Sequence, residues 1–121
     1  MLVVEGSVFI LQKETEVYAS LAGNAANGVP VLSVNRLNKI LYQAEQKLTY
    51  APGLPQRPWF RHTIYAPGLY TGYGVKTLPG IREAIEQNKW NEAQEQIEIV
   101  ARAIGNYTQE VQAASRLLMI R

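Results

Sequence analysis

The chain has 121 residues, with twelve Lys or Arg against ten Glu and a formal net charge of +2 at pH 7. It contains no Cys, no Asp and one His, which excludes disulfide frameworks, thiolate zinc sites, cysteine nucleophiles and catalytic triads built on Asp. The basic residues are scattered, so nucleic acid is not expected as a partner. A hydrophobic fraction of 47% and a charged fraction of 18% indicate one folded domain over residues 1–121.

The sequence gives no sign of a membrane segment or of a compartment. The apolar run Met1–Val4 is followed at once by Glu5 and Gly6, and it is too short for a signal-peptide core or a bilayer span. A chain without cysteine is compatible with the cytosol and with secretion alike. We therefore expect no direct contact with a membrane, and we draw no localisation from the sequence.

Two amphipathic helices are predicted in the first half of the chain. The first runs from about Val4 to Asn27, where Gly28 and Pro30 end it. The second runs from about Val34 to Thr49, with Ser33 as its N-cap. The first helix has apolar residues at helical spacing at Val4, Val8, Leu11, Tyr18, Leu21 and Ala25.

Two further helices are predicted in the second half. Thr77 caps a short helix over Leu78–Gln87, whose residues Leu78, Ile81 and Ile85 face inward. The last helix spans about 29 residues, or roughly 43 Å. Its apolar seam follows spacings of three and four at Trp90, Ala93, Ile97, Val100, Ile104, Tyr107, Val111, Ala114 and Leu118. Part of this seam, or of a second face at Ile99, Ala103 and Leu117, is expected to be left for another chain or domain.

These patterns predict an all-α fold, an up-and-down bundle of about four helices. A long irregular loop, at about residues 50–77, separates the second helix from the third. The stretch from Pro52 to Ile81 holds five of the six prolines, five of the nine glycines and the only histidine. Long segments without regular structure are uncommon in compact domains unless they are functional.

The central stretch has two readings on residue types alone. Its aromatic and basic residues could line a ligand pocket, or the aromatics could fix an irregular loop onto the helices. The cluster comprises Trp59, Phe60, Arg61, His62, Tyr65, Tyr70 and Tyr73. A lone histidine such as His62 is more often packed or hydrogen-bonded than a ligand or a base.

The segment from Arg57 to Ile81 reads RPWFRHTIYAPGLYTGYGVKTLPGI, with GLP upstream at 53–55. It resembles the C-terminal dimerisation domain of the glutamate carboxypeptidase II and transferrin receptor family, which has GLP, an RPFYRHVIYAP-like segment, a loop containing KY and an FPGI helix start. The match has no gap and includes Arg57, Pro58, Arg61, His62, Ile64, Tyr65, Ala66, Pro67, Tyr73, Pro79, Gly80 and Ile81.

The resemblance implies a helical module that follows a zinc peptidase domain in the full protein and pairs with its own copy across a two-fold axis. None of the family's zinc ligands falls in this chain. We therefore expect no catalytic residue, metal or cofactor in this domain, and zinc in the parent peptidase domain. The expected partners are a second copy and the peptidase domain of the parent chain, with the last-helix seam as the dimer or core surface.

The resemblance also assigns roles to residues of the loop, which reaches the active-site cleft in family peptidases. Tyr73 matches a tyrosine that contacts the terminal carboxylate of the substrate, and His62 matches a histidine at the pocket edge. Gly72 stands where the family has a lysine, which removes a charge-assisted contact to an acidic substrate. Lys76 is the candidate substitute. The alternative function is a small-ligand domain that binds a peptide or an acidic amino acid through the aromatic loop.

Overall fold

A computed structural model of the protein describes residues 2–25, 31–70 and 74–119. The all-α prediction is confirmed: four α-helices dominate, with a long loop between the second and the third. The elements are α1 (Leu2–Ala25), α2 (Val31–Gln43), the 3₁₀ helix η1 (Ala44–Leu48), β1 (Tyr65–Pro67), β2 (Val75–Thr77), α3 (Pro79–Glu86) and α4 (Trp90–Met119). Strands β1 and β2 form an antiparallel ribbon inside the predicted loop.

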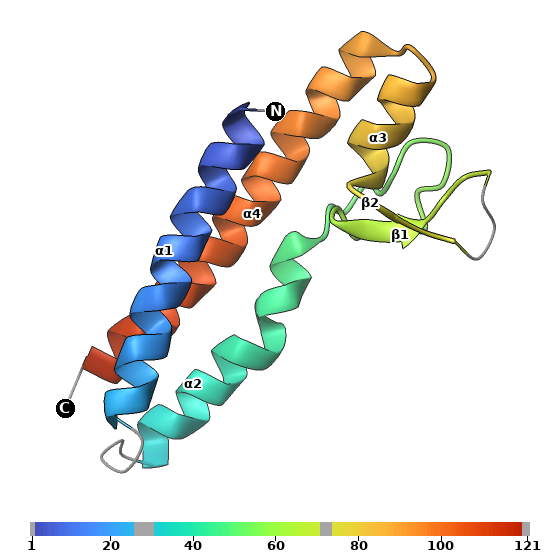
Figure 1. The fold of residues 1–121 in the computed structure, drawn as a ribbon. Helices are drawn as coiled ribbons and strands as arrows, with labels where there is room; N and C mark the ends of the chain where they lie inside the picture. The colour runs from blue at the N-terminus through green and yellow to red at the C-terminus, as the bar shows by residue number, and fades with distance from the viewer. Residues whose placement is uncertain (1, 26–30, 71–73, 120–121) are drawn as a thin grey trace.

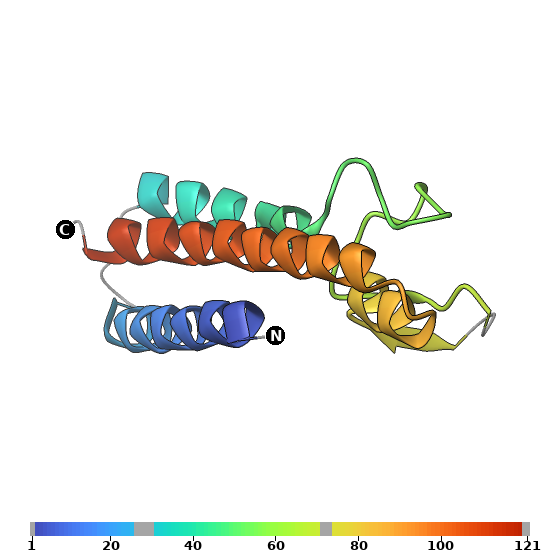
Figure 2. The ribbon, with the colours of Figure 1, turned by 90° about the horizontal axis from the view of Figure 1, so that it is seen from above.

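Helix α4 is the central element of the fold. It contacts α1, α2, η1 and α3. Figure 1 shows α1 beside α4 and running in the same direction, whereas α2 runs in the opposite one. Figure 2 shows α1 and α2 on opposite sides of α4, with the ribbon and α3 gathered at one end. The side of α4 that carries Glu98, Arg102 and Arg116 remains exposed.

The core is formed where α1, α3 and α4 meet. Its buried members are Val4, Ile81, Val100 and Ile104, each at most 4% exposed. Half-buried apolar residues from η1, the loop and α4 pack against them, including Leu48, Ile64, Leu78 and Ile97. Residues far apart in the sequence thus share one apolar cluster, which fixes the loop end of the molecule to α4.

The boundaries of α2 differ from the prediction at both ends. The helix begins at Val31, so Ser33 lies inside it and its prediction as the N-cap is wrong. At the other end the last turn tightens into η1, and Thr49 closes it by donating its N–H to the carbonyl of Gln46 at 3.2 Å. The predicted end of the first helix at Asn27, Gly28 and Pro30 lies outside the described residues.

The start of α3 also differs from the prediction. Thr77 belongs to β2, where it pairs with Tyr65, so it does not cap the helix. The N-cap position is Leu78, in the left-handed region with φ 46°, and its N–H donates to the carbonyl of Ile64 at 2.7 Å. The start of α3 is therefore held by the pairing of β1 with β2 and not by a side chain that caps the helix. Ile85 is 42% exposed, so its predicted inward orientation is wrong.

The predicted seam of α4 divides into three groups. Val100, Ile104 and Leu118 are buried, Ile97, Tyr107 and Val111 are half-buried, and Trp90 is 62% exposed. On the second face, Ile99 and Ala103 are buried within this chain, so these two residues are not left for another chain. They lie beside Thr49 and Tyr50, because the end of η1 and the start of the loop cross α4 there.

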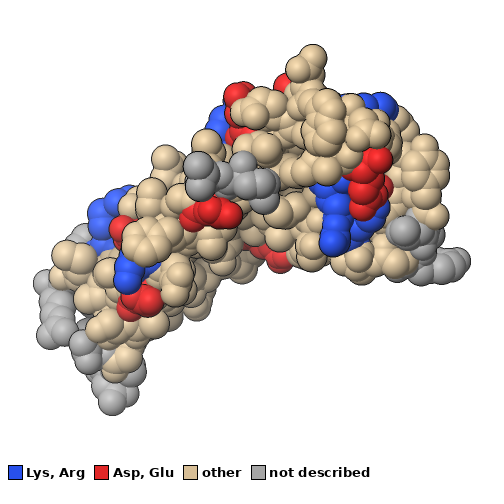
Figure 3. Space-filling view, turned by 45° about the horizontal axis from the view of Figure 1, so that its top comes forward, with Lys and Arg blue, Asp and Glu red and all other residues tan. Residues whose placement is uncertain are grey.

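Two features of the surface bear on function classes. No helix in the described part of the chain is both long enough and apolar enough to cross a bilayer. On the face shown in Figure 3, basic and acidic side chains lie in small mixed groups, without a broad area of one charge.

The two isoleucines of α3 test this core assignment. We expect Ile81→Ala to lower the free energy of unfolding by about 2–5 kcal/mol, because it leaves a cavity in the core. Ile85→Ala, the matched control on the same helix, should cost less than about 1 kcal/mol, since surface positions tolerate change. Urea denaturation followed by circular dichroism measures both. Equal losses in the two variants would contradict the assignment.

Candidate functional site

The loop between η1 and β1 is an ordered part of the structure. Tyr50 donates its N–H to the carbonyl of Arg61 at 2.8 Å, so the two arms of the loop run side by side. Thr63 binds the carbonyl of Leu48 twice, through its N–H at 3.0 Å and its hydroxyl at 2.5 Å. The loop thus returns to η1, and these hydrogen bonds pair backbone groups that would otherwise lack a partner.

The turn within this loop requires glycine at position 53. Gly53 has a φ of 80°, which other residues rarely adopt. A Cβ atom at this position would lie 2.1 Å from the carbonyl oxygen of Pro58, so a side chain has no room. The backbone conformation and the close carbonyl of Pro58 therefore explain the glycine of the GLP element.

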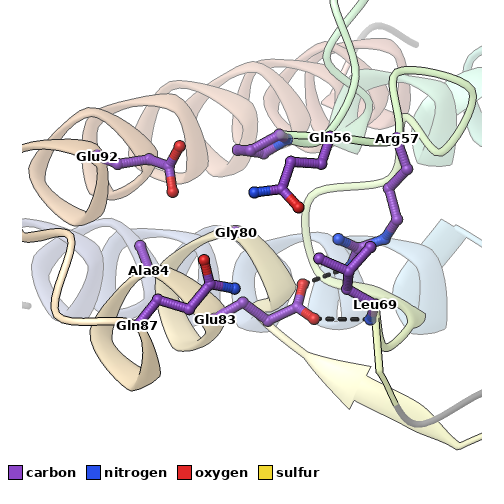
Figure 4. Close-up of a pocket in the computed structure, with 9 residues that line it drawn as sticks. Gln56, Arg57, Leu69, Gly80, Glu83, Ala84, Gln87 and Glu92 are labelled. Atoms are coloured by element: carbon purple, nitrogen blue, oxygen red, sulfur yellow. Dashed lines mark hydrogen bonds and ion pairs between the residues drawn. The ribbon is translucent and has the colours of Figure 1, made fainter.

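A buried ion pair between Arg57 and Glu83 joins the loop to α3 (Figure 4). Arg57 Nη2 lies 2.5 Å from Glu83 Oε1 and also donates to the carbonyl of Pro67 at 3.2 Å. Glu83 Oε2 accepts the N–H of Leu69 at 2.7 Å. The two side chains are only 5% and 8% exposed. One pair thus holds the loop, the end of β1 and α3 in a fixed relation.

Lys76 completes this charge cluster. Its Nζ atom lies 2.6 Å from Glu86 Oε2 and 3.9 Å from Glu83 Oε2. The side chain is 17% exposed. The ammonium group therefore already has two carboxylate neighbours on α3, which does not support Lys76 as the substitute for the lysine that Gly72 replaces.

The cavity beside the ion pair is too small for a substrate. Its volume is about 10 Å³, which is at the lower limit for one water molecule. Figure 4 shows Gln56, Gly80, Gln87 and Glu92 around it. Arg57 Nε is buried nearby and has no hydrogen-bond partner among the described residues. The centre of the loop is therefore a structural anchor.

His62 lies in a second polar cluster, with Tyr65 and Glu45. Its Nδ1 atom accepts the N–H groups of Ile64 at 3.2 Å and Tyr65 at 3.4 Å, which leaves the proton of the neutral ring on Nε2. Nε2 lies 3.4 Å from Glu45 Oε1, and the ring stacks on Tyr65 with centroids 4.0 Å apart. This geometry makes His62 a packed, hydrogen-bonded residue whose orientation is fixed.

Tyr65 and Glu45 form the exposed edge of this cluster. The Tyr65 hydroxyl donates to Glu45 Oε1 at 2.7 Å. This hydrogen bond, together with the negative charge of Glu45, raises the pKa of Tyr65 above its usual value of 10.0. The phenol therefore stays protonated as a donor throughout the physiological pH range, and it links β1 to η1.

The other residues predicted for the pocket are not brought together by the described part of the structure. Tyr73 and Gly72 lie outside the described residues. Trp59 is 70% exposed and Tyr70 is 81% exposed, so neither fixes the loop by burial. Across residues 2–25, 31–70 and 74–119, no three His, Cys, Asp or Glu side chains are grouped as metal ligands.

The residues that organise the loop were only partly visible in the sequence. Arg57 stands out as part of the RP element, but nothing in the sequence pairs it with Glu83, 26 residues away. Glu45 falls within the predicted second helix, and nothing in the sequence indicates that its carboxylate lies beside Tyr65 and His62. Long-range polar pairs of this kind have no local signal.

The fold and the anchored loop define a small all-α module with an attached β-ribbon. The family model of the transferrin receptor-like dimerisation domain matches residues 11–112. The "Probable glutamate carboxypeptidase LAMP1" of Arabidopsis thaliana is 42% identical over 94 residues, which is 72% of this chain and 14% of that protein. The "Probable glutamate carboxypeptidase" of Arthroderma benhamiae is 31% identical over 102 residues, which is 84% of this chain and 14% of that protein.

A third relative is TRE2 of Saccharomyces cerevisiae, provisionally named a zinc metalloprotease. It is 31% identical over 84 residues, which is 61% of this chain and 10% of that protein. This chain therefore belongs to the transferrin receptor-like dimerisation domain family. It spans about one seventh of the length of the two carboxypeptidases.

Removal of one partner of the buried ion pair tests its role. We expect Glu83→Gln and Arg57→Met each to lower the free energy of unfolding by about 3–5 kcal/mol, because each leaves a buried charge without its partner. The double variant Arg57→Met/Glu83→Met should lose less than the sum, since no uncompensated charge remains.

The matched control is the ion pair of Lys13 and Glu16, whose side chains are both 58% exposed. Lys13→Met should change the unfolding free energy by less than about 1 kcal/mol. Urea denaturation measures all four variants. If Glu83→Gln behaved like Lys13→Met, the anchoring role would be contradicted.

Proposed function

We propose that this chain is the dimerisation module of a glutamate carboxypeptidase-like zinc peptidase. It acts as a single domain over residues 1–121, is not catalytic alone, and associates with a second copy and with the peptidase domain of its parent. The observation that carries the proposal is the match of the dimerisation-domain family over residues 11–112. Zinc and the peptidase chemistry are assigned to the parent, in keeping with the names of the relatives.

The surface of α1 supports a role in association. Val3, Phe9, Ile10 and Val17 are between 47% and 59% exposed although α1 packs lengthwise on α4. A helix with apolar residues beyond its own contact face is typical of one that is buried in a larger assembly. Val3, Ile10 and Val17 recur every seven residues and so form one stripe, which we call the α1 stripe.

The loop supports a contribution to the substrate pocket of the parent. The hydrogen bond from Leu69 to Glu83 and the pairing of Pro67 with Val75 hold the described residues on either side of Gly72 and Tyr73. Binding residues are commonly carried by loops that a rigid scaffold positions. His62, held through Nδ1, stands near the start of the ribbon, and Tyr73 is the residue proposed to contact the carboxylate of the substrate.

The α1 stripe provides the test of association. We expect the wild-type chain to dimerise in sedimentation equilibrium, with an interface of at least about 1,000 Å². Ile10→Lys should weaken the dimer at least about ten-fold, because it places a charge in an apolar contact. Val75→Lys is the control, since Val75 is 70% exposed on β2. A wild-type chain that stays monomeric at high micromolar concentration would contradict the proposal.

The pocket role is tested in the full-length parent protein. Tyr73→Phe removes a hydroxyl donor to the terminal carboxylate of a peptide substrate, so we expect KM to rise about ten-fold with a smaller change in kcat. Trp59→Phe, at an exposed position of the same loop, is the control. Unchanged kinetics in the Tyr73 variant would contradict the pocket role and leave the dimer role intact.

A further inference from the structure

We propose that the small cavity beside the Arg57–Glu83 ion pair binds one water molecule, which joins the loop to the corner between α3 and α4. The water accepts a hydrogen bond from Arg57 Nε. It donates to two of the side-chain oxygens that line the cavity from the loop, the end of α3 and the start of α4, which belong to Gln56, Gln87 and Glu92. This inference is independent of the proposed function, because it concerns how the loop is held and not how the chain associates.

The donor in this site is Arg57 Nε. Arg57 Nη2 already donates to Glu83 and to the carbonyl of Pro67. Nε, in contrast, is buried and has no hydrogen-bond partner within the described part of the chain. A buried donor of a charged group is costly to leave unpaired, and such donors are rare in native proteins. A partner for this N–H is therefore expected in the cavity that Arg57 lines.

The cavity has the size and the lining for one water molecule. Its volume of about 10 Å³ is close to the least that holds a water. In Figure 4, the side chains of Gln56, Gln87 and Glu92 extend from different segments toward the space between them. A buried water makes about three hydrogen bonds. Arg57 together with two of these side chains provides that number.

The three side chains have no other use in the described part of the chain. Those of Gln56, Gln87 and Glu92 form no hydrogen bond or ion pair with another residue in the ranges 2–25, 31–70 and 74–119. Gln87 and Glu92 are half-buried, and Gln56 is exposed. Polar groups withdrawn from solvent are usually paired. One unpaired donor and several unpaired acceptors thus surround the same space.

The backbone of Gln56 supports a role for its side chain. Gln56 is the third residue of the turn Leu54–Arg57, which the Arg57 N–H closes by donating to the carbonyl of Leu54 at 3.2 Å. Its φ is 66°, in the left-handed region, where turns with proline in second place usually have glycine or asparagine. A glutamine at such a position is unfavourable for the backbone. Strain of this kind is found where the side chain has a function.

The lining selects a neutral molecule over an ion. A halide would be attracted by Arg57 but repelled by the carboxylates of Glu83 and Glu92, which line the same cavity. A metal ion or an ammonium ion would be repelled by the guanidinium group and could not accept its N–H. Water accepts from Arg57 and donates to the oxygens, so it suits both kinds of group.

The water gives the loop a connection that the ion pair does not provide. The Arg57–Glu83 pair joins the loop to β1 and α3. Glu92 lies in the first turn of α4, so a water shared with Glu92 or Gln87 holds the turn around Gln56 against the α3–α4 corner. A bridging water of this kind is nearly as favourable as a direct hydrogen bond.

A crystal structure of the whole chain, grown with bromide in the buffer, tests the site directly. We expect one water at about 2.7–3.2 Å from Arg57 Nε and from at least one side-chain oxygen of the cavity. The anomalous signal of bromide distinguishes a halide from a water. A bromide ion in the cavity, or a dry cavity beside an unpaired Nε, would overturn the proposal.

Two glycine substitutions test the role of Gln56 in solution. Gln56→Gly relieves the backbone but removes an oxygen from the site, so we expect the thermal midpoint to fall by a few degrees. Asn88→Gly is the matched control, because Asn88 has a φ of 57° and does not line the cavity. Its midpoint should stay unchanged or rise, since glycine favours this backbone region. A midpoint of Gln56→Gly that stays unchanged or rises would contradict the inference.

A double variant tests whether the side chains share one molecule. Gln56→Gly and Gln87→Ala should each lower the thermal midpoint, and the double variant should lose less than the sum, because the first change already releases the water. Circular dichroism measures the midpoints and checks that each variant is folded. Additive losses would show that the side chains act separately and would overturn the shared water. Neither result bears on dimerisation, which sedimentation equilibrium measures.

Discussion

The buried ion pair of Arg57 and Glu83 is the interaction on which the arrangement of the loop depends. It connects a proline-rich loop, the end of β1 and the inner face of α3. A buried charge pair is weak evidence for net stability, but the loss of either partner is costly, so the pair specifies one arrangement. The same pair holds Leu69, because Glu83 Oε2 accepts the N–H of that residue.

Helix α4 has the complementary role. It provides one long rigid element on which α1, α2, η1 and α3 are placed, and the side that carries Glu98, Arg102 and Arg116 remains exposed. The bundle is therefore open, and α1 keeps apolar residues on its outer surface. An open bundle of this kind gains stability from a second copy or from the parent chain, which gives a physical reason for a dimerisation module to have this shape.

The sequence was sufficient for features that depend on local periodicity and insufficient for those that depend on distant contacts. The spacing of three and four predicted α4 almost to the residue, and the proline content located the loop. Thr77 and Ser33 were misassigned as caps because ribbon pairing and an earlier helix start override local capping preference. Ile85 was predicted to face inward from its spacing, but it lies on the exposed side of α3. Ile99 is buried beside Thr49 and Tyr50, a contact between distant segments that spacing does not predict. His62 was located by resemblance, but its contact with Glu45 was found only in the structure.

The central claim is that this chain associates with its own copy, and its mass in solution tests that claim most directly. Light scattering on the chain at about 100 µM, eluting from a sizing column, gives the mass without reference to shape. The account predicts a mass of twice the 13.5 kDa of one chain, falling toward a single chain on dilution. A mass of 13.5 kDa at every concentration up to the solubility limit would contradict it.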